Sequence, residues 1–314
     1  MKIHTTLLAL ALALAAPVAP TLAEDAPNHI EEMKRWQPKA EAGDAEAQFE
    51  LGQMYALGHG FKQNFNSAME WYEKAAAQGN AKARTALGVL YYYGVGVEED
   101  KEKAGEWFEK AAAQDDATAQ RYLGSVAAKA KDYVQAKQWW EQAAAQNYAP
   151  AMKNIGSLYA SGEGVAQDFA EAKSWFEEGA KQKKLSASSM TSLAVLYTEG
   201  KGVKKNEKQA LDLLEKACEQ DSLDGGYACF GIGQSYLEGE TGLSKNNQKA
   251  FEYAMKAIKR GYSHGATLLL ILKESSFNFP DAEKEQALDF IAKRKDNQYW
   301  RTLGVMQSLK SLQD

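Results

Sequence analysis

Two stretches of the chain carry nearly the same sequence, 36 positions apart. Residues 68–88 read AMEWYEKAAAQGNAKARTALG, and residues 104–124 read AGEWFEKAAAQDDATAQRYLG. Further copies begin at residues 136 and 172, and fainter ones at 210, 250 and 287. A period of roughly 20–50 residues is typical of folds in which each unit packs mainly against its neighbours. The chain is therefore expected to form one elongated array instead of two globular domains.

Each period contains two predicted helices. In the first, an alanine, a Leu-Gly or Ile-Gly pair and an aromatic residue recur on one helical face. The clearest sets are Ala47, Leu51, Gly52, Tyr55; Ala83, Leu87, Gly88, Tyr91; and Ala151, Ile155, Gly156, Tyr159. In the second helix the apolar set is Ala68, Trp71, Tyr72, Ala75 and Ala76. Small residues allow the helices to approach closely while the aromatic rings fill the space between layers, which predicts an all-α, right-handed α-solenoid.

Glycines and capping residues mark the helix ends. A Gly-x-Gly-apolar loop follows the first helix at residues 58–61, 94–97, 162–165 and 200–203, and its glycines are suited to positive φ. Asn or Asp stands four positions before the first alanine of each second helix. These residues are Asn64, Asp100, Asp132, Asp168, Asn206 and Asn246. They are predicted to be N-caps, since one carboxylate per loop is too few ligands for calcium.

The repeats divide the chain into four segments. Residues 1–23 are a predicted signal peptide, and residues 24–44 a capping helix. Six repeats occupy residues 45–261, followed by a degenerate repeat and C-terminal capping helices over residues 262–314. The terminal segments are expected to cover the open ends of the array.

The pattern A-x-x-x-L-G-x-x-Y-x-x-G-x-G-V, followed by D-x-x-x-A-x-x-W-[YF]-x-x-A-A, resembles the Sel-1-like repeat (SLR) family, relatives of the tetratricopeptide repeats (TPR-like). It covers residues 45–261 well and the rest of the chain weakly. The copy at 117–148 departs from it, because the glycine loop is missing and Ala127 replaces the tyrosine. The resemblance implies a helix-turn-helix solenoid that binds proteins.

The N-terminus has the layout of an export signal. An apolar run at residues 7–16 follows Lys2, prolines break it, and small residues precede acidic Glu24. We expect cleavage near Ala23 and a periplasmic or secreted mature chain, with an uncleaved anchor as the alternative. The run is too short to span a bilayer and nothing else reads as transmembrane, so no stable membrane insertion is expected.

The two cysteines, Cys218 and Cys229, fall at the end of one second helix and the start of the next first helix. Antiparallel helices joined by a short turn bring such positions within disulfide range. In an exported protein the pair is expected to oxidise. The surrounding residues resemble the cysteine-rich branch of the SLR family, whose bridges staple the hairpin between repeats. A redox or metal role is disfavoured by the spacing and by the absence of nearby histidines.

Composition and motifs give little sign of catalysis. The net charge of −5 argues against nucleic acid, whose backbone requires clustered Lys and Arg. The four histidines are scattered, and no H-E-x-x-H, G-x-S-x-G or phosphate loop occurs. We expect no metal, no cofactor and no catalytic residue. Relatives in the cysteine-rich branch have been linked to penicillin binding, so a peptidoglycan or β-lactam-binding hydrolase stays the alternative.

A binding surface is predicted along the first helices, which line the concave face of such solenoids. Positions two before and two after each repeat's leucine, with a neighbouring tyrosine, should face a partner. They are Phe49, Gln53, Thr85, Val89, Tyr92, Arg121, Ser125, Lys153, Ser157, Thr191, Val195, Phe230 and Gln234. Exposed apolar groups among polar ones suit protein recognition. Some of them would instead be core residues if the helical phase is off by one position.

The function predicted from these features is a non-enzymatic scaffold or adaptor of the bacterial envelope. It would act as a monomer that holds a protein or peptide partner on the concave face. Nothing in the sequence names that partner.

Overall fold

The computed structural model describes residues 26–182 and 186–293, and all regular secondary structure in these ranges is helical. The helices are α1 Ala26–Glu41, α2 Ala45–Leu57, α3 Phe65–Ala77, α4 Ala81–Tyr93, α5 Lys101–Ala112, α6 Ala117–Lys129, α7 Tyr133–Ala145, α8 Ala149–Ser161, α9 Phe169–Lys181, α10 Ala187–Glu199, α11 Glu207–Glu219, α12 Leu223–Glu238, α13 Asn247–Lys259, α14 Gly265–Glu274 and α15 Lys284–Lys293. The predicted leader and residues 294–314 of the predicted C-terminal caps lie outside the described residues.

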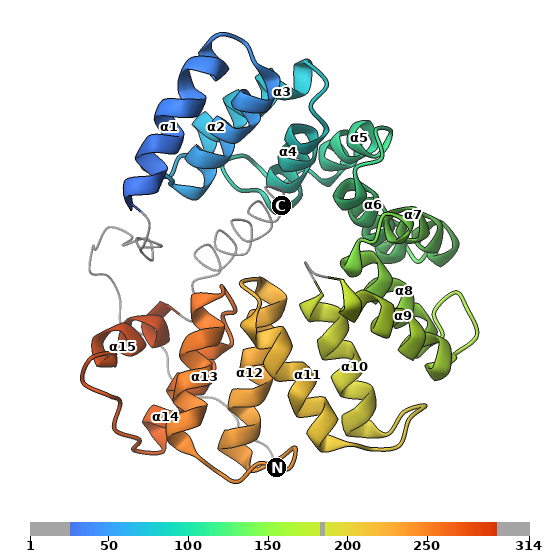
Figure 1. Cartoon of the computed structure of the whole chain (residues 1–314), viewed down its shortest axis with the longest axis vertical. Coiled ribbons are helices and arrows are strands. Elements are labelled where there is room, and N and C mark those ends of the chain that lie inside the picture. Colours follow the sequence, from blue (N-terminus) through green and yellow to red (C-terminus); the bar gives the residue numbers. More distant parts are fainter. Residues whose placement is uncertain (1–25, 183–185, 294–314) are drawn as a thin grey trace.

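Helices α2 to α13 form successive antiparallel hairpins. We call α2, α4, α6, α8, α10 and α12 the first helices, and the helix after each one its second helix. Each first helix packs on its own second helix, which in turn packs on the next first helix. Helix α1 packs on α2, and α14 continues the array from α13. The row curves so that α1 and α15 lie on the same side of Figure 1, with α4 and α6 nearer the inside than α5 and α7. The predicted all-α repeat fold is confirmed.

The predicted helix ends are confirmed. The side chains of Asn64, Asp100, Asp132, Asp168, Asn206 and Asn246 each accept a hydrogen bond from a backbone N–H in the first turn of the second helix that follows. Each bond satisfies a donor that helix geometry leaves without a partner. At the other end, α4 stops where Gly94 adopts φ 63°, a left-handed conformation that favours glycine.

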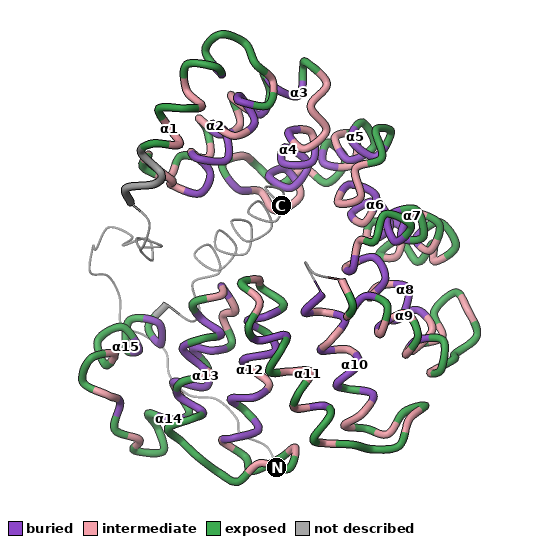
Figure 2. Tube along the Cα trace, viewed as in Figure 1, coloured by how far each residue is buried: buried purple, intermediate pink, exposed green. Residues whose placement is uncertain are grey.

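Close approach of paired helices explains the glycine of the Leu-Gly pair. A Cβ atom built on Gly88 of α4 would lie 2.5 Å from the ring of Phe108 of α5. Phe108 is completely buried, so this ring has little room to move. The same approach joins Gly124 to Trp140 and Gly156 to Phe176 in the next two hairpins. In Figure 2 the buried residues lie within the helices, and the exposed ones lie in the loops and also along helices such as α7.

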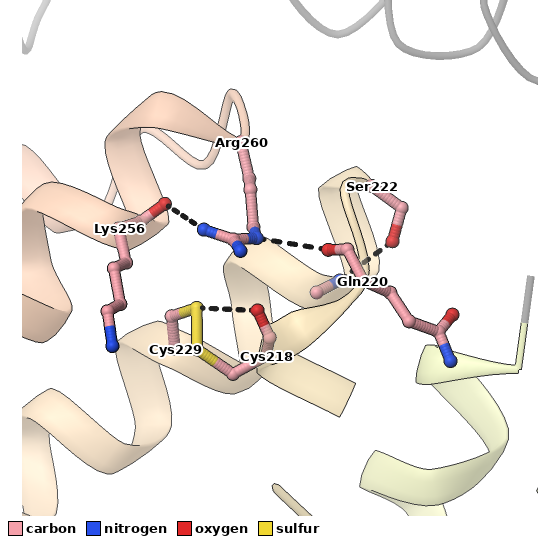
Figure 3. Close-up of a disulfide and its surroundings, with 7 residues drawn as sticks. Cys218, Gln220, Ser222, Cys229, Lys256 and Arg260 are labelled. Atoms are coloured by element: carbon pink, nitrogen blue, oxygen red, sulfur yellow. Dashed lines mark hydrogen bonds between the residues drawn. A yellow bond between two sulfur atoms is a disulfide. The ribbon is translucent and has the colours of Figure 1, made fainter. Parts of the chain in front are cut away.

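The predicted disulfide is present. Cys218 of α11 and Cys229 of α12 are bonded, with Cα atoms 4.8 Å apart, and both side chains are buried. Arg260, the residue that ends α13, links that helix to the turn between α11 and α12 by donating to the carbonyl oxygens of Gln220, at 3.0 Å, and Lys256, at 3.3 Å (Figure 3). The contact drawn from the sulfur of Cys229 to the Cys218 carbonyl is packing, because a disulfide sulfur has no hydrogen to donate. The bridge staples two successive repeats.

Candidate functional site

The predicted partner-binding residues fall into two groups in the structure. Five of them are buried: Phe49, Gln53, Thr85 and Val89, each with no exposed surface, and Thr191, which is 6% exposed. The prediction that these five face a partner is wrong. The other eight are half-buried or exposed: Tyr92, Arg121, Ser125, Lys153, Ser157, Val195, Phe230 and Gln234.

Helix α3 covers the two positions on α2. The ring of Phe49 packs against that of Tyr72, with centroids 5.9 Å apart. The hydroxyl of Tyr72 donates to Oε1 of Gln53 at 2.9 Å. Both side chains are therefore part of the contact inside the first hairpin, and a partner could reach them only by opening it.

The buried positions on α4 and α10 also have structural contacts. The hydroxyl of Thr85 donates to the carboxylate of Asp116 at 3.0 Å, and that carboxylate caps α6 by accepting from the N–H of Ala119 at 2.7 Å. Val89 lies in the same core cluster as Phe108. Thr191 donates to the carbonyl oxygen of Ala187, one helical turn earlier, at 2.8 Å. The sequence prediction did not include Asp116, which stands 31 positions after Thr85 at the N-cap of α6.

Two cations occupy the corresponding position on the middle first helices. Arg121 of α6 and Lys153 of α8 are each half-buried. The guanidinium of Arg121 lies over the ring of Tyr122 in a cation–π contact, with Cζ 3.9 Å from the centroid. Tyr122 in turn stacks on Phe108 with centroids 4.6 Å apart and planes at 1°. The guanidinium is thus held in place by this cation–π contact and by hydrogen bonds with the hydroxyl groups of Tyr122 and Tyr148.

The serines one turn after these cations make local bonds. Ser125 donates to the carbonyl oxygen of Arg121, and Ser157 donates to that of Lys153, both at 3.0 Å. The indole N–H of Trp140 also donates to the Arg121 carbonyl, at 3.1 Å. The backbone beneath Arg121 is therefore held by α7 as well as by its own helix.

Tyrosines surround the guanidinium. Burial opposes the positive charge of Arg121, but Tyr122, Tyr148 and Tyr93 outweigh that effect and hold its pKa above the ordinary value. Tyr122 and then burial raise the pKa of Tyr93, and burial raises that of Tyr148. Tyr93 and Tyr148 are therefore uncharged at neutral pH, whereas Arg121 keeps its full charge.

Lys153 has the opposite shift. Burial lowers its pKa, Asp224 of α12 acts against that effect, and the charge of Arg121 lowers the pKa further. The two cations are thus close enough to repel each other. We call Arg121 and Lys153 the central cation pair.

Aromatic residues gather at the start of α12. Phe230 lies 5.4 Å from Tyr262 and 5.8 Å from His264, and Tyr227 lies 5.4 Å from Tyr262, measured between ring centroids. The sequence prediction included Phe230 but missed the other three residues. Tyr227 is one of the residues between Cys218 and Cys229 that the repeat pattern lacks. Those extra residues were the sequence signal that could have pointed to this cluster.

The remaining predicted residues are dispersed. Tyr92 packs between Tyr93, 5.0 Å away, and Tyr122, 5.8 Å away, so most of its ring has a structural contact. Val195 of α10 is 44% exposed, and Gln234 of α12 donates to Glu238 on its own helix at 3.0 Å. The prediction missed Tyr93, Tyr122 and Tyr148, which come from two neighbouring repeats.

The described residues contain no group of three or more His, Cys, Asp or Glu side chains placed to hold a metal ion. Within residues 26–182 and 186–293, no helix combines the length and apolar character needed to cross a membrane.

Six segments of the chain match the family model described as Sel1 repeat: residues 45–80, 81–116, 118–148, 149–184, 187–222 and 226–262. Among solved structures, the chain is similar to a Sel1 repeat protein from Oxalobacter formigenes. The identity is 28% over 74% of this chain and 97% of that one, with a TM-score of 0.60. No curated protein sequence matches the chain.

Two further structures are similar. One is c5321, described as a protective antigen in uropathogenic Escherichia coli strains displaying an SLR fold. It is 28% identical over 85% of this chain, which spans 57% of that chain, with a TM-score of 0.52. The other is the immunity protein Pa5087 from Pseudomonas aeruginosa, 20% identical over 69% of this chain and 81% of that one, with a TM-score of 0.54. This last likeness shows the fold alone.

Proposed function

Because the chain belongs to the Sel1 repeat family, we propose that it is a non-enzymatic scaffold of the bacterial envelope that binds a protein or peptide along its first helices. Folds of this family generally serve as protein-interaction scaffolds. The observation that carries the proposal is the central cation pair. Two half-buried positive charges lie on neighbouring first helices, and neither forms an ion pair with a described residue.

The disulfide supports the proposed location. Buried bridges persist in oxidising compartments and are rare in the cytosol. Together with the predicted leader at residues 1–23, this favours an exported monomer in the periplasm or outside the cell. Fractionation of cells that express the full chain tests this location, and a reduced chain in the cytosolic fraction would contradict it.

A crosslinking pull-down from the native envelope tests the binding proposal. The bait is residues 24–314, compared with a variant in which Arg121 and Lys153 are both changed to Glu. We expect one or more proteins to be captured by the unchanged bait and lost from the variant. Changes at Phe49 or Val89 are unsuitable, because a charge placed in the core would unfold the bait.

The matched control changes Lys137 and Lys173 to Glu. These lysines lie on second helices α7 and α9, so the control makes the same change in net charge at a different place. Capture should survive it. Equal capture by the cation-pair variant, or no capture by any bait, would contradict the proposal. Stoichiometric labelling of the purified chain by a fluorescent penicillin would instead support the alternative hydrolase.

A further inference from the structure

Two buried side-chain polar atoms in the described part of the chain have no hydrogen-bond partner. They are Nε of Arg121 and Oγ of Ser188. Arg121 lies on α6 and Ser188 on α10, the first helices on either side of α8, which carries Lys153. A buried donor without an acceptor destabilises the folded state, so natural proteins rarely keep one without a reason. These two atoms therefore point to a missing polar ligand along the middle first helices.

The positive charge at this place is also unbalanced. Other half-buried lysines of the array, such as Lys137 and Lys173, form ion pairs with Glu141 and Glu177 on their own helices. Arg121 has no such ion pair with a described residue, and its closest polar neighbours are tyrosines that carry no charge at neutral pH. Asp224 influences Lys153 only from beyond ion-pair distance. The ligand that completes this place is therefore expected to be an anion.

The geometry favours a planar anion. The guanidinium lies over the ring of Tyr122, and it also has hydrogen bonds with the hydroxyl groups of Tyr122 and Tyr148, so the Nε–H edge is the part left without an acceptor. That edge matches the two oxygens of a carboxylate. The hydroxyl oxygen of Tyr148 accepts a hydrogen bond from Thr118 at 3.3 Å, so its own proton can be donated to an added oxygen. Lys153 then supplies a second charge from the next first helix.

We propose that the central cation pair binds an aspartate or glutamate side chain of an extended partner peptide. Arg121 donates hydrogen bonds to the carboxylate, and Lys153 is the second cation. This inference rests on the proposed scaffold function and names the chemistry of its partner. A side chain is favoured over a C-terminal carboxylate because α6 and α8 are the third and fourth of six first helices. A peptide lying across them has further helices on both sides and has no need to end there.

Three small probes test the proposal on the intact chain. N-acetylglutamate α-amide offers a side-chain carboxylate, N-acetylglutamine α-amide offers none, and N-acetylglutamine offers only a terminal carboxylate. The readout is the NMR signal of the Arg121 Nε–H group, assigned by its loss in Arg121→Lys. We expect N-acetylglutamate α-amide to shift this signal saturably, with a dissociation constant in the millimolar range. The neutral amide should leave it unchanged.

Variants locate the effect. Lys153→Met should weaken binding of N-acetylglutamate α-amide roughly tenfold, because it removes one charge-assisted contact. The control Lys137→Met on α7 should not change it. Circular dichroism confirms that each variant stays helical, and Lys→Met keeps the length of the aliphatic stem.

Several outcomes would overturn the proposal. The carboxylate site is contradicted if N-acetylglutamate α-amide leaves the Arg121 signal unchanged. It is also contradicted if N-acetylglutamine α-amide shifts the signal equally. Tighter binding of N-acetylglutamine would assign the pair to a peptide C-terminus instead, and tighter binding of inorganic phosphate would assign it to a phosphate group. The titration needs no partner, so it is independent of the pull-down. A flat titration beside a successful capture would remove the carboxylate site and leave the scaffold function.

Discussion

Helices α2 and α4 differ from helices α6 and α8 in the side chain that they carry at the same repeat position. Two residues before the leucine, α2 carries Phe49 and α4 carries Thr85, both completely buried. At that position α6 carries Arg121 and α8 carries Lys153, both half-buried and charged. The backbone framework is the same in all four, since each helix packs on its own second helix through the same close contact.

The difference lies in what surrounds the position. On α2 the ring of Tyr72 fills the space, and on α4 the carboxylate of Asp116 contacts the position from the N-cap of the next first helix, α6. On α6 and α8 no such neighbour neutralises the cations. The repeat therefore sets the place of a residue on its helix. Whether the side chain is buried or exposed depends on the residues that surround it.

The largest expected effect separates the two kinds of position by stability. Phe49→Ala should lower the free energy of unfolding by about 3–5 kcal/mol, because it leaves a cavity beside Tyr72. Lys153→Ala at the same repeat position should change it by about 0.5 kcal/mol or less, as at a surface site. Urea denaturation followed by circular dichroism measures both. Similar losses at the two positions would mean that α2 and α8 do not differ as described.

A second prediction concerns the close contact between α4 and α5 and its contribution to stability. Gly88→Ala should destabilise the chain by about 1–3 kcal/mol, since the new methyl group would overlap the buried ring of Phe108. The control is Gly105→Ala on α5, where a Cβ atom meets nothing within 4 Å. That change should stabilise the helix by up to about 1 kcal/mol. If thermal melts move in the same direction for both variants, the close contact of α4 with α5 is not required.

Much of the fold could be predicted from the sequence. The position of Asp100 relative to the alanines of α5 identified a helix N-cap, and Gly94 identified the preceding helix end, because both signals are local. The disulfide also followed from the repeat register, which places Cys218 and Cys229 at one end of two antiparallel helices.

The candidate site was only partly predictable. Arg121 and Lys153 were included in the prediction because they occupy the repeat position that was expected to line the concave face. The cluster around Arg121 was missed because Tyr93, Tyr122 and Tyr148 come from the end of α4, from α6 and from the start of α8. Contacts that span several repeats depend on the curvature of the array, which the pattern of a single repeat does not contain.

The contact between Thr85 and Asp116 gives a smaller expected effect. Burial raises the pKa of Asp116, and the Thr85 hydroxyl partly counters this by donating to the carboxylate. Thr85→Val removes that donor and should destabilise the chain by about 1–2 kcal/mol at neutral pH. Ser125→Ala, at a half-buried position on α6, should cost about 0.5 kcal/mol or less. Chemical denaturation of both variants measures the difference, and equal losses would show that Asp116 does not depend on Thr85.

The smallest expected effect has the opposite sign and depends on pH. The pKa of Lys153 in the folded chain lies below its ordinary value of 10.5, mainly because of burial. The folded state therefore holds this proton less well than the unfolded state, so the charge destabilises folding. That penalty is complete below the folded pKa and disappears as pH rises from there towards 10.5. Lys153→Met should raise the melting temperature at neutral pH, and the gain should shrink over this window.

Lys173 on α9 supplies a control of opposite sign. The hydrogen bond that Lys173 donates to the carboxylate of Glu177 raises the pKa of Lys173 above its ordinary value of 10.5. Its charge therefore stabilises folding below 10.5, and that contribution is lost as pH rises through the folded pKa. Lys173→Met should accordingly lower the melting temperature slightly at neutral pH. Melting curves compared with the unchanged chain at each pH cancel the titration of other groups. If the melting temperature changes in the same direction for both lysine variants, Lys153 already has a counter-charge. The central cation pair would then not differ from the ion-paired lysines of the second helices.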